Sequence, residues 1–143
     1  MRIYADNAAT TKMSRRAVEA MLPYMTEVYG NPSSLHTMGQ QAREALEDAR
    51  ARIARILNCD PREVVFTSGG SEADNQAIRS AAWLGARKNK RHIISTAFEH
   101  HAVLHTLKKL EQEGFEVTLL DVHENGLVTA EQVAEAIRGI PAW

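Results

Sequence analysis

The stretch Thr67-Ser68-Gly69-Gly70-Ser71-Glu72-Ala73-Asp74-Asn75 stands between a short β-rich run at 63–66 and a helix-like run at 73–84. The first N–H groups of a helix have no partner within the helix, and the aligned peptide dipoles add partial positive charge there. Because Gly69 and Gly70 carry no Cβ, a phosphate can approach this backbone closely, and Ser71 adds a hydroxyl donor. A strand, a glycine turn and a helix start in this order therefore predict an anion-binding site.

A second interpretation of the same stretch needs no ligand. Ser71 would be the N-cap, Asp74 a weak capping-box partner, and the acidic side chains of the first turn would complement the helix dipole. The stretch also lacks the lysine of a P-loop and the spacing of a dinucleotide fingerprint. The residues alone leave both interpretations open. If an anion binds here, the site is neither a P-loop nor a dinucleotide-binding turn.

The composition limits the classes of function. The chain has 143 residues, the size of one domain, and its formal net charge of −1 argues against a nucleic-acid or membrane-surface partner. Its apolar runs are too short to span a bilayer, and its first residues become polar too early for a signal peptide. The single cysteine, Cys59, excludes an internal disulfide framework and fits a reducing cytosol, so we expect a cytoplasmic protein.

Hydrophobic periodicity predicts strands that alternate with helices. Helices are expected at about 15–27, 38–57, 73–84, from the histidines at 100–101 to about 113, and at 130–138; strands are expected at 64–66, 92–96 and 116–120. Pro23 should kink or end the first helix. The alternation is typical of an α/β fold with mostly parallel strands. Ligands in such sheets bind beyond the carboxyl ends of the strands, so residues 69–71 and His100 should lie at the same edge.

Three histidines follow the expected strand at 92–96. His101 and His105 are four residues apart and share a helix face, which a metal site can use. No glutamate follows the first histidine as in zinc proteases and no cysteine pair is present, so we expect a solvated or capping role for these two and no metal. His100 differs because it stands at the strand-to-helix corner, where its flat ring can cover a bound heteroaromatic ligand.

Four motifs together carry a family resemblance. They are YADNAATT at 4–11, GNPSSLH at 30–36, FTSGGSEADN at 66–75 and EHHAVL at 99–104, and residues 121–128 also fit. In this order and spacing they resemble the cysteine desulfurases of the NifS/IscS type. These enzymes depend on pyridoxal 5'-phosphate and have the aspartate-aminotransferase-like fold. The resemblance implies that this chain is the N-terminal part of the large domain of such a fold, with an incomplete, mostly parallel sheet.

The resemblance assigns roles to individual positions. It implies that Gly70 and Ser71 hold the cofactor phosphate, and that His100 stacks on the pyridine ring and assists proton transfer as a catalytic residue. It places five residues at the entrance to the site: Asn7, Ala8, Thr10, Asn31 and His36. It also implies a division into an N-terminal arm at 1–14, which contributes to the small domain and the site entrance, and the start of the cofactor-binding large domain at 15–143.

The chain also departs from the family pattern. The family's chain is longer, and its cofactor-binding lysine, the aspartate facing the pyridine nitrogen and the sulfur-accepting cysteine all lie beyond residue 143. Cys59 matches no catalytic position. The family's sheet places later strands between the strands expected here at 64–66 and 93–95. We therefore expect this chain to need the remainder of its own polypeptide as a partner, and the complete protein to be a homodimer.

The function expected from the resemblance is that of a cysteine desulfurase. The complete enzyme would take sulfur from L-cysteine, release alanine and pass a persulfide to a sulfur-accepting scaffold protein for iron–sulfur cluster assembly. This chain alone is expected to be inactive. Two alternatives stay open: a catalytically dead remnant or partner-binding fragment, and a related pyridoxal-phosphate lyase that acts on another amino acid.

Overall fold

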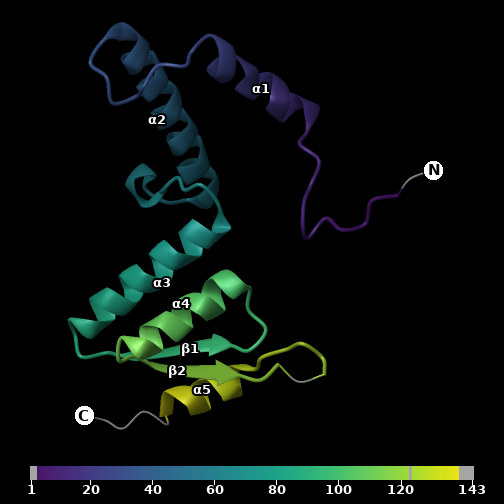
Figure 1. Cartoon of the computed structure of the whole chain (residues 1–143), viewed down its shortest axis with the longest axis vertical. Helices are drawn as coiled ribbons and strands as arrows, with labels where there is room; N and C mark the ends of the chain where they lie inside the picture. Colours follow the sequence, from purple (N-terminus) through teal and green to yellow (C-terminus); the bar gives the residue numbers. More distant parts are fainter. Residues whose placement is uncertain (1–2, 123, 139–143) are drawn as a thin grey trace. The chain divides into compact units, whose positions relative to one another are not determined.

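The computed structural model describes residues 3–122 and 124–138 (Figure 1). Its elements are α1 (Arg15–Thr26), α2 (Thr37–Leu57), the 3-10 helix η1 (Pro61–Glu63), α3 (Gly70–Ala86), β1 (His92–Thr96), α4 (His101–Gln112), β2 (Glu116–Leu120) and α5 (Ala130–Arg138). The chain divides between Val65 and Phe66 into two compact units, an N-terminal and a C-terminal one. Among the described residues, none of these helices is long and apolar enough to cross a membrane. The expected division at residues 14 and 15 stays a prediction.

In the N-terminal unit, α1 begins and ends where local chemistry dictates. The Ser14 hydroxyl oxygen accepts a hydrogen bond from the Ala17 N–H at 3.1 Å, as expected of an N-cap. Pro23 lies inside the helix, which continues beyond it to Thr26. Proline has no N–H to bond to the preceding turn, but its carbonyl still accepts from the Glu27 N–H at 2.8 Å, and the helix ends within one turn of Pro23.

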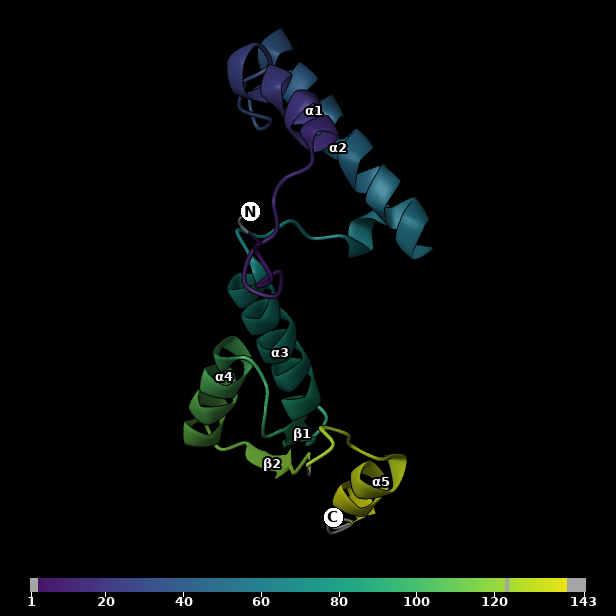
Figure 2. The ribbon, with the colours of Figure 1, turned by 90° about the vertical axis from the view of Figure 1, so that its right-hand side faces the viewer.

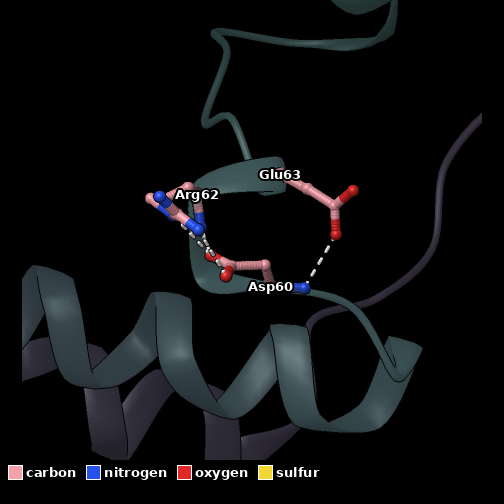
Figure 3. A network of polar contacts seen from close by, with 3 residues as sticks. All are labelled: Asp60, Arg62 and Glu63. Atoms are coloured by element: carbon pink, nitrogen blue, oxygen red, sulfur yellow. Dashed lines mark hydrogen bonds and ion pairs between the residues drawn. The ribbon is translucent and has the colours of Figure 1, made fainter.

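Helix α2 follows and ends as its sequence predicts. Asn58 adopts a left-handed conformation with φ 55°, and the N–H of Cys59 donates to the Ala54 carbonyl at 3.0 Å. In the next turn, Asp60 and Glu63 form a capping box that holds η1, and Arg62 pairs with Asp60 at 3.0 Å (Figure 3). Polar side chains therefore define the sharp turn that leads out of α2.

The strand predicted at 64–66 is wrong. After η1 the N–H of Val64 bonds back to the Pro61 carbonyl at 3.2 Å, and the Val64 carbonyl accepts from the Arg50 guanidinium. The side chains of Val65 and Phe66 are 59% and 43% exposed. A short apolar run becomes a strand only where a second backbone pairs with its N–H and C=O groups. Here the backbone groups of Val64 are bonded within the turn and to α2 instead.

The C-terminal unit contains a parallel pair of strands, as the alternating pattern predicted. β1 and β2 pair from His92↔Glu116 to Thr96↔Leu120, and α4 is the crossover between them. Helices α3 and α4 lie on one side of this pair and α5 on the other (Figure 2). The residues buried between these elements are Ala82, Thr106, Leu107 and Leu110. The core of this unit is therefore formed mainly by α3 and α4.

The ends of α4 and α5 also agree with the sequence. Gly114 has φ +87° just past α4, a conformation that glycine adopts without strain. The Thr129 hydroxyl accepts from the Gln132 N–H at 3.3 Å, and the Gln132 side chain accepts from the Thr129 N–H at 2.8 Å. This reciprocal pair is the capping box that a threonine before the final helix predicts.

The pair of strands has two outer edges, and no further strand of the described residues pairs with either of them. The sheet holds two strands, so β1 is paired along one edge with β2 and its other edge has no strand beside it. No large side chain of the described residues is completely buried. The fold is thus an α/β arrangement with an incomplete, parallel sheet.

Candidate functional site

A hollow of about 350 Å³ lies where α3 and α4 begin, within the C-terminal unit. Its lining comes from the first two to three turns of α3 and from the N-cap and first two turns of α4, and consists of Ser71, Asn75, Arg79, His100, His101, Ala102, His105 and Thr106. The structure thus brings together Ser71 and His100, two of the residues singled out from the sequence. Of the two, only His100 follows a strand, because residues 64–66 form none.

The start of α3 is open on its outer side. Gly69 is the N-cap and makes no side-chain cap, and Ser71 lies inside the first turn, so the interpretation of Ser71 as the N-cap is wrong. A Cβ added to Gly69 or Gly70 would meet no atom within 4 Å. An anion can therefore reach the first N–H groups of the helix without displacing protein atoms.

Glu72 orders the loop that precedes this helix start. Its carboxylate accepts hydrogen bonds from the Ser68 hydroxyl at 2.6 Å and from the Ser68 N–H at 2.7 Å. The hydroxyl bond, followed by the backbone bond, lowers the pKa of Glu72 below its ordinary value. The carboxylate is therefore engaged with Ser68, ahead of the helix, and leaves the N–H groups of the first turn to another acceptor.

His100 is the N-cap of α4, a local role that the sequence did not reveal. Its Nδ1 accepts a hydrogen bond from the Ala102 N–H at 3.1 Å. Because Nδ1 is the acceptor, the proton of the neutral ring is assigned to Nε2. The cap fixes the imidazole at the rim of the hollow with Nε2 as its remaining proton-carrying atom.

His101 and His105 also line the hollow and are exposed. Their rings stack with centroids 5.5 Å apart, and the His101 ring is 6.2 Å from that of His100. Among the described residues, no three His, Cys, Asp or Glu side chains form a group that could hold a metal ion. Their place in the hollow makes these histidines neighbours of any ligand bound there.

Sequence reasoning gave no role to four residues of the hollow, Asn75, Arg79, Ala102 and Thr106, and two of these bond to each other. The Asn75 side-chain amide donates to the Ser71 carbonyl at 2.9 Å, and the Thr106 hydroxyl donates to Asn75 Oδ1 at 2.7 Å. The signal for Asn75 was present, since an asparagine four residues after Ser71 lies one helical turn away on the same face. Thr106 is 31 residues further on and belongs to another helix, so nothing local marks it.

The five residues predicted at the entrance all lie in the N-terminal unit, where their backbone and side chains make local bonds. The Asn7 carbonyl accepts from the Thr11 hydroxyl, and Thr10 pairs with the Tyr4 hydroxyl. The turn at 7–9 contains Ala8. Their place at an entrance stays a prediction.

The other two entrance residues flank the loop at 30–36. Asn31 Oδ1 accepts from the Ser33 N–H at 2.9 Å, an Asx turn. His36 Nδ1 accepts from the Gly39 N–H at 3.4 Å as the N-cap of α2. In this geometry both side chains shape the backbone of their own unit.

The residues of the hollow fit a phosphate joined to a flat heteroaromatic ring. The open helix start and the Ser71 hydroxyl suit the phosphate, and the His100 imidazole suits the ring. The two features stand on neighbouring helices that pack against each other. Pyridoxal 5'-phosphate combines both groups in one molecule.

Comparisons with known proteins agree on one family. The model of class-V aminotransferases matches residues 3–141. The cysteine desulfurase IscS of Neisseria meningitidis is 52% identical over 137 residues, which are 95% of this chain and 34% of that protein. The structure of a NifS-like protein superimposes with a TM-score of 0.88 at 41% identity, over 94% of this chain and 37% of the other.

A second structure, of SspA in complex with cysteine, gives a TM-score of 0.86 at 40% identity over 95% of this chain and 39% of the other. The chain spans about a third of the length of the curated relatives that it matches. The α/β fragment described above therefore has the fold of the corresponding part of NifS-like pyridoxal-phosphate enzymes.

Proposed function

Because the chain belongs to the class-V aminotransferase family, we propose that it is the N-terminal part of a cysteine desulfurase and that the hollow at Ser71 and His100 holds pyridoxal 5'-phosphate. The observation that carries this proposal is the convergence of an open helix start and a fixed imidazole on one hollow. Relatives that match nearly all of this chain bear that activity in their names.

The phosphate end of the cofactor belongs at Gly70 and Ser71. Its oxygens would accept from the N–H groups of the first turn of α3 and from the Ser71 hydroxyl, with the helix dipole favouring the negative charge. Because Glu72 is held on Ser68 by two hydrogen bonds, its carboxylate does not occupy these donors. A hydrogen bond to a charged group is worth roughly 1.5–3 kcal/mol.

The ring end belongs beside His100. The cap to the Ala102 N–H holds the imidazole plane and keeps the exchangeable proton on Nε2. His100 would therefore stack on the pyridine ring and give or take a proton at Nε2. Bound pyridoxal phosphate would supply the electron sink for the bonds at the Cα of the amino acid.

The reaction proposed for the complete protein takes sulfur from L-cysteine, releases alanine and leaves an enzyme persulfide for a sulfur-accepting scaffold protein in iron–sulfur cluster assembly. A similar structure is of a protein in complex with cysteine, which favours this amino acid. The cofactor-binding lysine and the nucleophilic cysteine are expected in sequence beyond residue 143. Cys59 is half-buried just past the end of α2 and is not assigned a catalytic role.

The remaining partners belong to the same proposal. The uncovered edge of β1 and the exposed apolar side chains of both units favour the remainder of the same polypeptide as the covering segment. We expect the complete protein to be a cytoplasmic homodimer. Its entrance would include Asn7, Ala8, Thr10, Asn31 and His36.

The first test concerns the phosphate. In the full gene product, Ser71→Ala should weaken cofactor retention by roughly 10- to 150-fold, because it removes one charge-assisted hydrogen bond. Ser80→Ala is the matched control, since Ser80 lies in the same helix but lines a different hollow. Absorbance of the bound cofactor after dialysis measures both. Equal cofactor loss in the two variants would contradict the placement of the phosphate.

The second test concerns the activity. Residues 1–143 alone should release no sulfide from cysteine above a cofactor-only control, whereas the longer gene product should. Sulfide from the longer product separates the desulfurase from a lyase that acts on another amino acid. A longer product that binds cofactor but releases no sulfide from cysteine would contradict the proposed reaction.

A further inference from the structure

We infer that Asn75 and Thr106 are positioning residues that set the spacing between the Ser71 and His100 ends of the hollow. The inference rests on the proposed function, because it concerns the two ends of a cofactor bound there. Neither residue needs to touch the ligand for this role. Their effect comes from a hydrogen bond between Asn75 of α3 and Thr106 of α4.

One hydrogen bond joins the two helices, and bonds within each helix flank it. The Asn75 amide holds the Ser71 carbonyl at 2.9 Å, and Asn75 Oδ1 holds the Thr106 hydroxyl at 2.7 Å. The Thr106 hydroxyl is also 2.8 Å from the Ala102 carbonyl. Ala102 is in turn the residue whose N–H is bonded to His100 Nδ1 at 3.1 Å. Of these contacts, the bond between Asn75 and Thr106 crosses from α3 to α4, and the others lie within one helix or its cap.

The orientation of the Asn75 amide follows from its neighbours. Its nitrogen must face the Ser71 carbonyl, because two oxygens at 2.9 Å would repel each other. The amide oxygen therefore faces Thr106 and needs a donor, which the single hydroxyl hydrogen of Thr106 provides. The same hydroxyl also lies 2.8 Å from the Ala102 carbonyl, so its one hydrogen is shared between two acceptors, of which Asn75 is the one on the other helix.

Because it is buried, the bond between Asn75 and Thr106 should hold α3 and α4 together more strongly than an exposed polar contact does. Thr106 is 3% exposed, and it is the buried polar residue between α3 and α4. Among the described residues, an ion pair joins Arg79 of α3 to Glu113, the C-cap of α4, at 3.6 Å, and its side chains are 44% and 43% exposed. Exposed ion pairs of this kind contribute little, whereas a buried acceptor left without its donor is costly.

The chemistry of the ligand explains why the spacing matters. A phosphate and a ring joined in one molecule have a fixed separation, so the helix start and the imidazole must be placed together. If α4 slid against α3, the phosphate and the ring could not both keep their contacts. The link converts two independent helix starts into one site of defined length.

The experiment compares three threonine variants of the full gene product. Thr106→Val removes the hydroxyl that faces Asn75, and Thr106→Ser keeps it. Thr118→Val is the matched control, because it removes another 2.7 Å side-chain bond, to His92, on the strand pair. Titration with pyridoxal 5'-phosphate gives the dissociation constant, and visible circular dichroism per bound cofactor reports how the ring is held.

We expect Thr106→Val to raise the dissociation constant about five- to tenfold and to change the dichroism per bound cofactor. Thr106→Ser and Thr118→Val should stay within about twofold of the wild type and leave the dichroism unchanged. Equal effects of Thr106→Val and Thr118→Val would overturn the inference, because the hydroxyl would then act only through general stability. A Thr106→Ser variant that fails to keep the wild-type values would overturn it as well.

Amide hydrogen exchange of the cofactor-free protein separates this inference from the proposed function. Thr106→Val should speed exchange of the amides in the second turns of both α3 and α4, whose N–H groups bond to first-turn carbonyls, and Thr118→Val should not. A wild-type protein that takes up no pyridoxal phosphate would contradict the proposed function. Unchanged exchange in the Thr106→Val variant would instead overturn the link itself.

Discussion

Of two short apolar runs of similar composition in this protein, one forms a β-strand and the other does not. Ile93, Ile94 and Ser95 lie within β1, paired with β2 and half-buried along the whole strand. Residues 64–66, Val-Val-Phe, have equally strong β propensity, yet form no strand. Their local sequence does not separate the two runs, so the cause lies elsewhere in the chain.

The two runs differ in whether a second strand pairs with them. β1 is followed by a helix and then by β2, so the crossover returns a second strand to it in register. Helix α3 follows residues 64–66, and the next strand in sequence, β1, is paired with β2. An apolar run thus specifies a surface to be buried, whereas strand formation depends on a second backbone that the run does not encode.

The largest expected effect is on the stability of the C-terminal unit, in which α4 packs near β1. Leu107 of α4 is 3% exposed and lines the same apolar hollow as Ile93 and Ile94 of β1. Leu107→Ala should lower the free energy of unfolding of the C-terminal unit by about 2–5 kcal/mol, because it removes buried methyl groups and leaves a cavity. Denaturant unfolding followed by circular dichroism measures the change.

Val65→Ala is the control from the other run. The Val65 side chain is 59% exposed, so its removal should change the free energy of unfolding by less than about 0.5 kcal/mol. A cost for Val65→Ala as large as that for Leu107→Ala would show that residues 64–66 are packed after all.

Hydrogen exchange gives the next largest contrast. In the 143-residue chain at micromolar concentration, amides of β1 and β2 that bond across the pair should exchange about a hundredfold more slowly than the amide of Val65, a difference of about 2.7 kcal/mol in opening free energy. Slow, cooperative protection of both runs in a monomer would mean that residues 64–66 find a partner within this chain. The comparison would then fail.

Features controlled by neighbouring residues were predictable from the sequence. Ser14, Thr129 and Gly114 mark helix ends through bonds that span three or four residues, and each lies where the sequence placed it. The parallel pairing of β1 and β2 followed from the helix between them. The strand at 64–66 was wrong because strand pairing depends on residues distant in sequence.

The same distinction between local and long-range contacts applies to the candidate site. Ser71 and His100 were recognised from motifs, since each occupies a helix start with a distinctive local sequence. The cap that His100 makes and the link from Asn75 to Thr106 were missed, because the first competes with other local bonds and the second joins residues 31 positions apart. Side-chain partners across elements become visible only when the elements are packed.

The smallest expected effect concerns the loop that joins residues 64–66 to α3, where order comes from side chains rather than from strand pairing. Glu72 accepts from the hydroxyl and the N–H of Ser68, and these bonds lower its pKa. A carboxylate with a lowered pKa in the folded state stabilises that state at neutral pH. The stabilisation is lost as the pH falls below about 4.3 and through the folded-state pKa.

Exchange of the Ser68 amide, whose N–H donates to the Glu72 carboxylate, should therefore accelerate at acidic pH in the wild type, beyond the intrinsic pH dependence, and Glu72→Gln should abolish this extra acceleration. Ser68→Ala is the intermediate case, because it removes the hydroxyl bond, the larger cause of the lowered pKa, and keeps the backbone bond. An NMR titration of the Glu72 carboxylate should then show a pKa between that of the wild type and the ordinary value. A Glu72 pKa that Ser68→Ala leaves unchanged would mean that the hydroxyl does not hold the carboxylate, and that the loop before α3 is ordered by its backbone alone.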